Sequence, residues 1–347
     1  MKRLSIFIVG IMMAVVAMSR TFDMKQLGAD AKGIKSCTEL INRTIEKAAS
    51  EGGGTIYFPA GTYLTATIHM KSNITLYLES GAVLRFSDKF EDYLPFVTLR
   101  WEGTVMKSLS PLIYAHSADN VTISGRGTLD GNGLKWWLWE FDTRKVIKEN
   151  GGKLPALDKL QQMWVDANKN LEISDYYKPS LERRMFRPPF IQFYECTNIL
   201  IENVKIINSP FWTINPAFCD NVTIHGVTIN NPSSNPKGPN TDGINPSSCR
   251  NVRISDCFIS VGDDCITIKS GRDADGRKYG KACENITITN CIMLSGHGGV
   301  VIGSEMSGGV KRVAISNCVF DGTNAGIRLK ASRGRGGVCL LYTSPSP

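Results

Sequence analysis

The chain has 347 residues, of which 42% are hydrophobic and 21% are charged, and its formal net charge is +8. A mildly basic balance favours acidic partners. No nucleic acid partner is expected, because the sequence contains no recognition helix, zinc-finger spacing or aromatic RNA-binding signature. The length suits either two average domains or one repetitive β architecture, so the repeats must decide between them.

Residues 1–19 have the pattern of a signal peptide. Lys2 and Arg3 precede an apolar run from Leu4 to Ala17, which small residues follow. We therefore expect an exported protein, periplasmic or secreted, whose net charge falls to +6 when Lys2 and Arg3 are removed. The alternative is a membrane tether, but so short an apolar run is a poor transmembrane helix. No membrane association is expected once the signal is removed.

A short amphipathic helix is predicted after the signal. Ser36 and Glu39 have the spacing of a capping box. The apolar side chains that share one face of this helix are Leu40, Ile41, Ile45 and Ala48. A glycine-rich break at 51–54 ends the helix, and a strand-like run at 55–58 follows.

From there a short motif recurs, an asparagine followed by three mostly β-branched residues. The copies begin at Asn73, Asn120, Asn198, Asn221, Asn251 and Asn285, and a degenerate seventh copy begins near Arg312. The late copies are 23, 30 and 34 residues apart. Strand-rich repeats with periods in this range indicate a solenoid. We predict an all-β fold, a single-stranded right-handed parallel β-helix, over residues 20–337.

The repeated asparagines are predicted to be turn residues with left-handed backbone conformation. Four of them, Asn73, Asn120, Asn221 and Asn285, also match the glycosylation pattern, but the turn interpretation explains all copies.

Cysteines recur at fixed positions of the repeat. Cys196, Cys219, Cys249 and Cys283 each lie two residues before a repeat asparagine. A small apolar residue at one repeat position predicts a buried stack of thiols, although a bridge between neighbouring turns stays geometrically possible. A zinc site is not expected, because no close Cys or His pairs have ligand spacing.

Two segments interrupt the pattern. Residues 134–187 carry Trp136, Trp137, Trp139 and Trp164 and a helical stretch from Leu157 to Ala167, and we interpret them as an insertion between coils. The insertion forms either a wall of a binding site or a hydrophobic flap packed on the solenoid. Residues 338–347 do not continue the repeat and look like translated adapter DNA. We therefore expect a C-terminally truncated solenoid with a non-native tail.

Four short motifs between Asn240 and Lys330 carry chemistry. They are Asn240-Thr241-Asp242, Gly262-Asp263-Asp264, Gly296-His297-Gly298 and Arg328-Leu329-Lys330. If Ile244 and Ile266 occupy the same position of successive coils, Asp242 and Asp264 stack. Simple strand alternation would separate Asp263 from Asp264, so a bend after Gly262 is required to bring them together.

Acids this close cannot all ionise at their ordinary pKa values, and one should stay protonated. Paired carboxylates are what glycosidic bond cleavage requires. His297 lies between two glycines, as expected at a closely approached position where it could tune an acid. Arg328 and Lys330 are expected to point outward from one strand and to bind a carboxylate.

These four motifs, in this order, resemble those of the polygalacturonases of glycoside hydrolase family 28, with Leu329 in place of isoleucine. The resemblance extends from about Phe22 to Gly337. It implies that the N-terminal helix caps the open end of the β-helix. It further implies hydrolysis of α-1,4-galacturonosidic bonds in polygalacturonate or pectin with inversion, without cofactor or metal, by a protein expected to be monomeric.

By the same resemblance Asp263 is the general acid, Asp242 and Asp264 hold and activate the water, and His297 tunes the acid. Asn240, Arg328 and Lys330 are expected to bind the acidic polysaccharide. The run from Gly296 to Val310 resembles exo-acting bacterial members, so exo action is expected. The alternatives are a calcium-dependent pectate lyase, a carbohydrate-binding β-helix impaired by truncation, and a related rhamnogalacturonan hydrolase.

Overall fold

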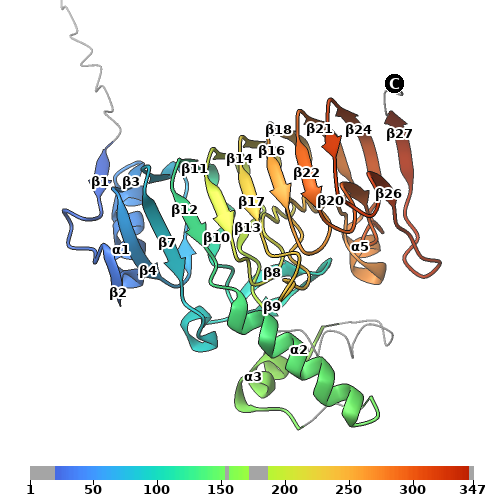
Figure 1. The fold of residues 1–347 in the computed structure, drawn as a ribbon, viewed down its shortest axis with the longest axis horizontal. Coiled ribbons are helices and arrows are strands. Elements are labelled where there is room, and N and C mark those ends of the chain that lie inside the picture. Colours follow the sequence, from blue (N-terminus) through green and yellow to red (C-terminus); the bar gives the residue numbers. More distant parts are fainter. Residues whose placement is uncertain (1–19, 153–155, 172–186, 344–347) are drawn as a thin grey trace, which may run out of the picture.

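Three faces of parallel strands run along the molecule. The structure is a computed structural model, and it describes residues 20–152, 156–171 and 187–343. Figure 1 shows the strands stacked side by side from β1 to β27 in a single solenoid, and this confirms the predicted right-handed parallel β-helix. The predicted signal peptide at 1–19 lies outside the described residues. In the described part of the chain, no helix combines the length and apolar character needed to cross a bilayer.

The first face is a ten-stranded sheet. Its strands in spatial order are β1 (Thr21–Asp23), β3 (Gly54–Phe58), β6 (Ile74–Leu78), β11 (Asp119–Gly125), β14 (Thr197–Glu202), β16 (Asp220–His225), β18 (Arg250–Ser255), β21 (Cys283–Thr289), β24 (Val310–Ser316) and β27 (Cys339–Thr343). The second face is a nine-stranded sheet. It contains β2 (Lys32–Ser36), β4 (Gly61–Thr65), β7 (Ala82–Phe86), β12 (Thr128–Asp130), β15 (Lys205–Ile207), β17 (Thr228–Asn230), β19 (Phe258–Ser260), β22 (Ile292–Ser295) and β25 (Val319–Phe320).

The third face consists of two short sheets that isolated bridges join into one surface. The first sheet contains β5 (Ile68–His69), β10 (Ile113–His116) and β13 (Ile191–Tyr194), and the second contains β20 (Ile266–Ile268), β23 (Val300–Ile302) and β26 (Ile327–Leu329). The bridges pair Ile191 with Ile214, Ile214 with Ile244, and Ile244 with Ile266. The third face therefore continues through every coil from β5 to β26.

The core follows from the parallel register. Val121, Ile199, Val222 and Val252 align on successive coils of the first sheet, and all are buried. Because successive side chains of a strand point to opposite faces, every second residue of each strand points into the interior and stacks on its equivalents in the neighbouring coils. Each fully buried aliphatic side chain contributes about 1.5–3 kcal/mol. The repeat of apolar residues is thus both the sequence signal of the fold and its main stabilising element.

The repeat asparagines have the backbone conformation that the sequence predicted. Asn73, Asn120, Asn198, Asn221, Asn251 and Asn285 have φ values of 60°, 57°, 53°, 56°, 57° and 58°. Arg312, which begins the degenerate copy, keeps the left-handed conformation at 52°. The amides also form a ladder along the molecule, since Asn221 donates to Asn198 at 2.6 Å and Asn285 donates to Asn251 at 2.8 Å. The turn prediction is confirmed.

The repeated cysteines stack in the interior as free thiols. Cys196, Cys219, Cys249 and Cys283 are all buried and unbridged. Their sulfurs lie near backbone carbonyls, as at Cys219, which donates to the Phe193 oxygen at 3.1 Å. The prediction of stacked thiols is confirmed for these positions.

Helix α1 (Thr38–Ser50) covers the N-terminal end of the β-helix and buries Ile41, Ile45 and Ala48. The predicted capping box is wrong. The N-cap residue is Cys37, which makes no side-chain capping hydrogen bond. Ser36 instead ends β2, whose pairing with β4 holds it in the sheet, so the helix begins one residue later than a Ser36 cap requires.

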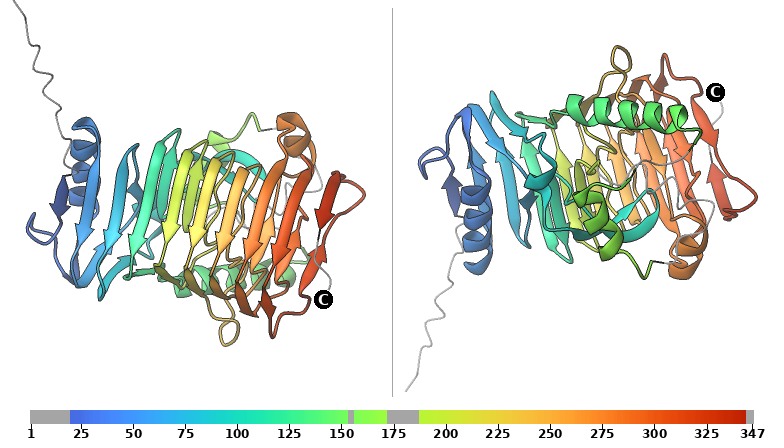
Figure 2. Two further views of the ribbon diagram at one scale, coloured as in Figure 1. Left: turned by 90° about the horizontal axis from the view of Figure 1, so that it is seen from above. Right: turned by 90° about the horizontal axis from the view of Figure 1, so that it is seen from below.

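The insertion between coils forms two helices, α2 (Leu134–Glu149) and α3 (Lys159–Ala167). Both lie along one side of the solenoid, where Figure 2 shows them over the strands in the view from below. Trp136 and Trp164 are buried, and Trp137 is also buried and donates to the Ser209 oxygen at 2.9 Å. Most of the tryptophans therefore attach the helices to the coils, as the flap interpretation expected.

Three smaller elements complete the described chain. A 3₁₀ helix, η1 (Phe90–Tyr93), precedes an antiparallel hairpin of β8 (Val97–Trp101) and β9 (Thr104–Ser108), and α5 (Asp273–Tyr279) follows β20. Residues 338–347 were expected to leave the repeat. Strand β27 instead pairs in parallel with β24, because β24 offers unpaired backbone groups on that side and the β27 residues are good strand formers.

The asparagine ladder generates a stability prediction. Asn251→Ala should lower the free energy of unfolding by about 2–4 kcal/mol. The variant places a Cβ-bearing residue without a polar side chain at a left-handed position and loses the contacts of Asn251 with Asp220 and Asn285. Asn251→Gly should cost only about 1–2 kcal/mol, because glycine accepts this backbone conformation. Urea titration at constant m-value measures both changes, and equal losses would contradict a backbone contribution.

Candidate active site

The four sequence motifs meet on the third face, near the C-terminal end of the described solenoid. Ile244, Ile266 and Val300 align on successive coils. Asp242, Asp264 and Gly298 each lie two residues before one of these positions. The backbone repeats the alignment, since the Gly243 N–H donates to the Asp264 carbonyl at 3.0 Å. The expected stacking of Asp242 and Asp264 on neighbouring coils is thereby confirmed.

Gly298 is required at the next position of this column. A Cβ on Gly298 would lie 2.4 Å from the Val301 side chain and 3.3 Å from Oδ1 of Asp264. The absence of a side chain keeps space over that carboxylate. Oδ1 of Asp264 is buried and makes no hydrogen bond to another described residue. Such an oxygen is suited to accept a hydrogen bond from a bound water or substrate.

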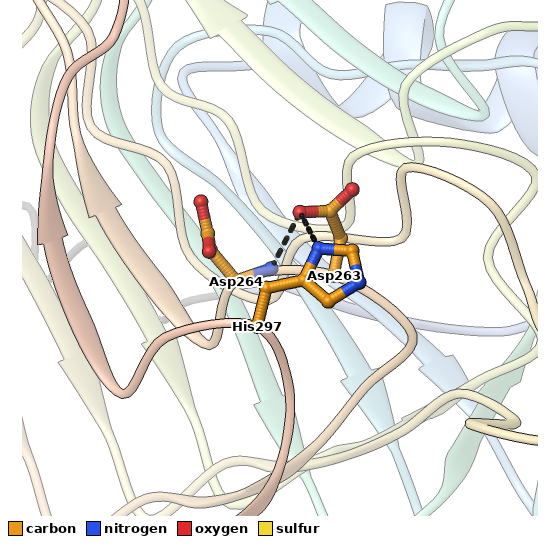
Figure 3. A group of neighbouring side chains, drawn as sticks. All are labelled: Asp263, Asp264 and His297. Atoms are coloured by element: carbon orange, nitrogen blue, oxygen red, sulfur yellow. Dashed lines mark hydrogen bonds and ion pairs between the residues drawn. The ribbon is translucent and has the colours of Figure 1, made fainter. Parts of the chain in front are cut away.

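Asp263 joins the pair through a bend in the backbone, as the sequence required. Residues 262 and 263 form a bend before β20, and a Cβ on Gly262 would lie 2.2 Å from the Gly238 carbonyl oxygen. Oδ1 of Asp263 accepts the Asp264 backbone N–H at 2.9 Å and lies 3.1 Å from Nδ1 of His297. Figure 3 shows the three side chains, with His297 reaching Asp263 from the following coil.

The three carboxylates differ in their access to solvent. The side chain of Asp263 is 19% exposed, whereas those of Asp242 and Asp264 are 4% and 1% exposed. Asp263 is therefore the acid that a large molecule bound on the surface can touch. Asp242 and Asp264 lie beneath it and can act on a small molecule such as water.

Burial and neighbouring charges shift the pKa values of Asp242 and Asp263 in opposite directions. Burial, followed by the charge of Asp263, raises the pKa of Asp242 well above its ordinary value. Burial also acts to raise the pKa of Asp263, but the hydrogen bond from His297 and the positive charges of Lys330 and Lys269 bring the net pKa below its ordinary value. Of these two acids, Asp242 is therefore the one that keeps a proton to the higher pH in the ligand-free protein. The expectation that one acid is held protonated agrees with this division.

Lys330 lies closer to the acids than the sequence suggested. Its Nζ forms an ion pair with Oδ2 of Asp264, and its side chain is 25% exposed. Arg328 lies on the exposed strand β26, beside the space over Gly298. Of these two cations, the structure thus directs Lys330 toward an acid of the protein and leaves Arg328 at the surface.

A second buried lysine, Lys269, was not predicted. Its Nζ lies 3.7 Å from Oδ2 of Asp242 and 2.8 Å from Oε2 of Glu305. Burial acts to lower the pKa of Lys269, but the charges of Glu305 and Asp242 outweigh it and raise that pKa. Lys269 occupies the same position of its coil as Lys330, three residues after the aligned Ile266 and Ile327. Aligning the coils by this position is the sequence signal that could have found it.

Glu305 connects Lys269 to further cations. Arg272 donates to its Oε1 at 2.8 Å, and Arg335 lies 3.1 Å from the same oxygen. Burial acts to raise the pKa of Glu305, but these cations and Lys269 hold it far below its ordinary value. Removing one member would leave an uncompensated buried charge, which typically costs about 3–5 kcal/mol. This network fixes Lys269 beneath Asp242.

Asn240 is held by the protein itself. Nη2 of Arg187 donates to Oδ1 of Asn240 at 2.7 Å, and Nη1 donates to the Pro239 carbonyl oxygen at 2.5 Å. Arg187 is fully buried and lies 3.6 Å from Glu140 of helix α2. The side-chain oxygen of Asn240 is thus engaged in a hydrogen bond within the protein. Glu140 and Arg187, which the sequence did not single out, connect the inserted helix to the Asp242 segment.

The acids also have a geometry that a metal ion could use. Asp263, Asp264 and His297 each offer one ligand atom, and these atoms lie within 4.8 Å of one another. However, Asp264 is paired with Lys330, and Asp263 is hydrogen-bonded to His297. Lys330 and the His297 ring therefore already occupy the carboxylate oxygens that a metal ion would need, and the cluster is better suited to acid–base chemistry.

Comparison with known proteins agrees with this geometry. Residues 178–340 match the family model of the glycosyl hydrolases family 28, and residues 21–139 match a model described as rhamnogalacturonase A/epimerase, pectate lyase-like. A hyperthermoactive exopolygalacturonase from Thermotoga maritima is 40% identical in sequence, with a TM-score of 0.79 over 92% of this chain and 70% of that chain. The chain belongs to family 28 of the glycosyl hydrolases.

Other relatives of this family 28 protein extend the comparison. A probable polygalacturonase from Vitis vinifera is 34% identical over 84% of this chain, which spans 52% of that relative. The family 28 exopolygalacturonase of Yersinia enterocolitica shares the fold, with a TM-score of 0.74 and 23% identity over 93% of this chain and 58% of that chain. The chain thus spans only about half the length of its plant relative.

The raised pKa of Asp242 predicts a pH-dependent stability. Between the unfolded pKa of about 3.9 and the higher folded value, the native state of this family 28 protein binds one more proton than the unfolded state. Its stability should therefore fall as pH rises through this window, by up to about 1.4 kcal/mol per pH unit. Asp242→Asn removes this dependence, so the variant should gain stability relative to the parent as pH increases. Denaturant titrations at several pH values measure the difference, and a constant difference would contradict a protonated Asp242.

Proposed function

We propose that this chain hydrolyses α-1,4-galacturonosidic bonds of polygalacturonate, acting on the acidic polysaccharide as an exo-acting, inverting glycosidase. The observation that supports this most is the arrangement of one accessible acid, Asp263, and two buried acids, with Lys330 paired to Asp264 and Arg328 on the exposed strand β26. Glycosidic bond cleavage needs a proton donor and a carboxylate that activates water. The cations suit a substrate that carries a carboxylate on every sugar.

Asp263 is proposed to be the general acid. It is the most exposed of the three carboxyl groups, so it can reach the oxygen of the leaving sugar. In the ligand-free protein His297, Lys330 and Lys269 lower its pKa. A substrate carboxylate bound at Arg328 and Lys330 would neutralise part of this positive charge, and the sugar would exclude water. Both effects raise the pKa of Asp263 and move the proton to it from Asp242.

Water activation is proposed for Asp242 and Asp264. The unpaired Oδ1 of Asp264 accepts a hydrogen bond from the water and takes its proton as the oxygen attacks the anomeric carbon. Asp263 gives its proton to the departing glycosidic oxygen in the same step. Lys269 and Lys330 stabilise the ionised acids from below and from the side. The products are a shortened chain and a galacturonate with a new anomeric hydroxyl.

The stereochemistry needs its own test. The nearest atoms of Asp263 and Asp264 lie within 4.8 Å, and a short carboxyl separation is typical of retaining enzymes. Inversion is favoured here because the ion pair with Lys330 hinders Asp264 from attacking the sugar directly. Proton NMR of the first product should show the β-anomer before mutarotation. An initial α-anomer would contradict inversion and indicate a covalent intermediate on one of the buried acids.

The activity itself is tested by digesting polygalacturonate with a chelator present. We expect new reducing ends without absorbance near 235 nm, and mono- or digalacturonate as the first products. Absorbance at that wavelength would indicate a lyase, and binding without reducing ends would indicate a carbohydrate-binding β-helix. A rhamnogalacturonan substrate serves as the comparison for the related specificity.

The similarity to exopolygalacturonases supports the exo mode, and a ladder of long oligomers would contradict it. The export signal expected at 1–19 supports action outside the cytoplasm.

Asp263→Asn should reduce the hydrolytic rate by roughly 10²- to 10⁴-fold, because it removes the proton donor and preserves the shape of the side chain. Circular dichroism and denaturant titration should show a folded protein. Asp321→Asn is the matched control, since Asp321 is an exposed aspartate after β25 and should retain the parent rate. If Asp263→Asn kept more than about half of that rate, Asp263 would not be the acid.

Arg328→Ala should weaken binding of trigalacturonate by about 1.5 kcal/mol. This is the lower end for a hydrogen bond to a charged group, since Arg328 lies on an exposed strand. Binding of a neutral oligosaccharide of the same length should change little. Calorimetry at low and high salt measures the difference, which should shrink as salt screens the charge. Arg126→Ala removes an exposed arginine of another segment as the control, and equal losses for charged and neutral ligands would contradict carboxylate recognition.

A further inference from the structure

His297 has a second partner that the acid–base scheme does not explain. Nε2 of His297 lies 2.7 Å from Nζ of Lys237, while Nδ1 lies 3.1 Å from Oδ1 of Asp263. Lys237 belongs to the segment between β17 and Asp242. Both ring nitrogens of His297 are therefore engaged, one by a cation and the other by an acid.

The chemistry of these groups allows only one arrangement of protons. A lysine ammonium has three donors and no acceptor, so Nε2 of His297 must accept from Lys237. A neutral imidazole has one donor and one acceptor, which places its hydrogen on Nδ1. Nδ1–H then donates to Asp263. While the Lys237 contact holds, the imidazole cannot take a second proton on Nε2.

We propose that Lys237 is a positioning residue that fixes the Nδ1–H tautomer of His297 and thereby selects which oxygen of Asp263 carries the acid proton. This role in catalysis rests on the proposed function, whereas the tautomer does not. Oδ1 of Asp263 receives two N–H donors, from His297 and from the Asp264 backbone. A proton on Oδ1 would face both donors, so the transferable proton must reside on Oδ2.

Lys237 is held in place by a tightly packed segment. The Gly238 N–H donates to the Pro232 carbonyl at 2.9 Å, and the Thr241 hydroxyl donates to the Gly238 carbonyl at 2.8 Å. A Cβ on Gly238 would lie 2.8 Å from Thr241 and 3.2 Å from Trp137 of helix α2. The inserted helix thus packs against the residue that follows Lys237 and limits where its ammonium can lie.

The charges around His297 explain why a cation is useful at this place. Asp263 faces the ring directly, Asp264 lies within 4.8 Å with Lys330 on it, and Asp242 with Lys269 lies beneath them. Without Lys237 no donor would occupy Nε2, so the ring could carry a hydrogen there as well as on Nδ1. An imidazolium would hold Asp263 as a carboxylate and deprive it of the acid proton. Lys237 opposes this loss by occupying Nε2.

Nitrogen NMR of the full chain labelled at its histidine rings tests the tautomer directly. The chain has 4 histidines, and comparison with His297→Gln assigns the signals of His297. We expect a protonated Nδ1 and a bare Nε2. Lys237→Met should shift His297 toward the Nε2–H tautomer or imidazolium, whereas Lys237→Arg, which keeps a donor, should preserve Nδ1–H. Lys205→Met, which removes an exposed lysine on β15, should change nothing.

Kinetics on polygalacturonate test the catalytic consequence. Lys237→Met should lower kcat by about 5- to 10-fold with KM nearly unchanged, the effect of one misplaced hydrogen bond. Lys237→Arg, which keeps a donor for Nε2, should restore most of the rate.

The two measurements separate the two proposals. An Nε2–H tautomer in the parent protein, or a Lys237→Met spectrum identical to the parent, would overturn the role of Lys237 whatever the substrate. An expected spectrum with an inactive parent protein would instead contradict the proposed hydrolysis. A Lys237→Met variant with the expected spectrum but parent kinetics at every pH would overturn the catalytic part of the inference.

Discussion

The parallel register of the third face is the constraint on which the site depends. Strands β20, β23 and β26 of this face are only three residues long, and adjacent coils before them meet through single bridges such as Ile244 with Ile266. That alignment places Asp242 and Asp264 at the same position of neighbouring coils, about 4.8 Å apart in the direction of stacking. A slip of one residue would turn one carboxylate to the opposite face. The buried isoleucine column therefore sets the geometry of the acids, because only one register buries all of its members.

Such a stack of acids is unfavourable by itself, and the fold offsets it with buried cations. Lys269 lies beneath Asp242 and Lys330 beside Asp264, while Glu305 holds Lys269 from the other side. A network of this kind adds little net stability compared with apolar packing, but it makes each member costly to remove. Its consequence is functional. The pKa of Asp242 is raised, and Asp263, the more exposed acid, is the one that a charge bound at the surface can reach.

The inserted helices pack on the outer side of the solenoid and contact the segment that precedes Asp242. Helix α2 contributes Glu140 beside the buried Arg187, whose guanidinium binds Asn240. The same helix packs through Trp137 against Gly238, next to the lysine that contacts His297. The segment before Asp242 is thus held from outside by the insertion and from inside by the coil. The coil supplies the acids, and the insertion supports the segment whose lysine contacts His297.

The sequence by itself determined the repeat and the acids. A residue such as Asn251 needs a left-handed turn wherever it occurs, and an apolar residue such as Ile254 must face the interior, so local chemistry reveals the coil. Only the tertiary structure decided which cation meets which acid. Lys237 and His297 are 60 residues apart, and Lys330 and Asp264 are 66 apart. The coils between these residues differ in length, so no fixed spacing in the sequence predicts the contacts. The prediction of a capping box at Ser36 was wrong for a related reason, since Ser36 lies in strand β2 and pairs with β4. Periodic burial can be read along a chain, whereas electrostatic pairing depends on how unequal coils stack.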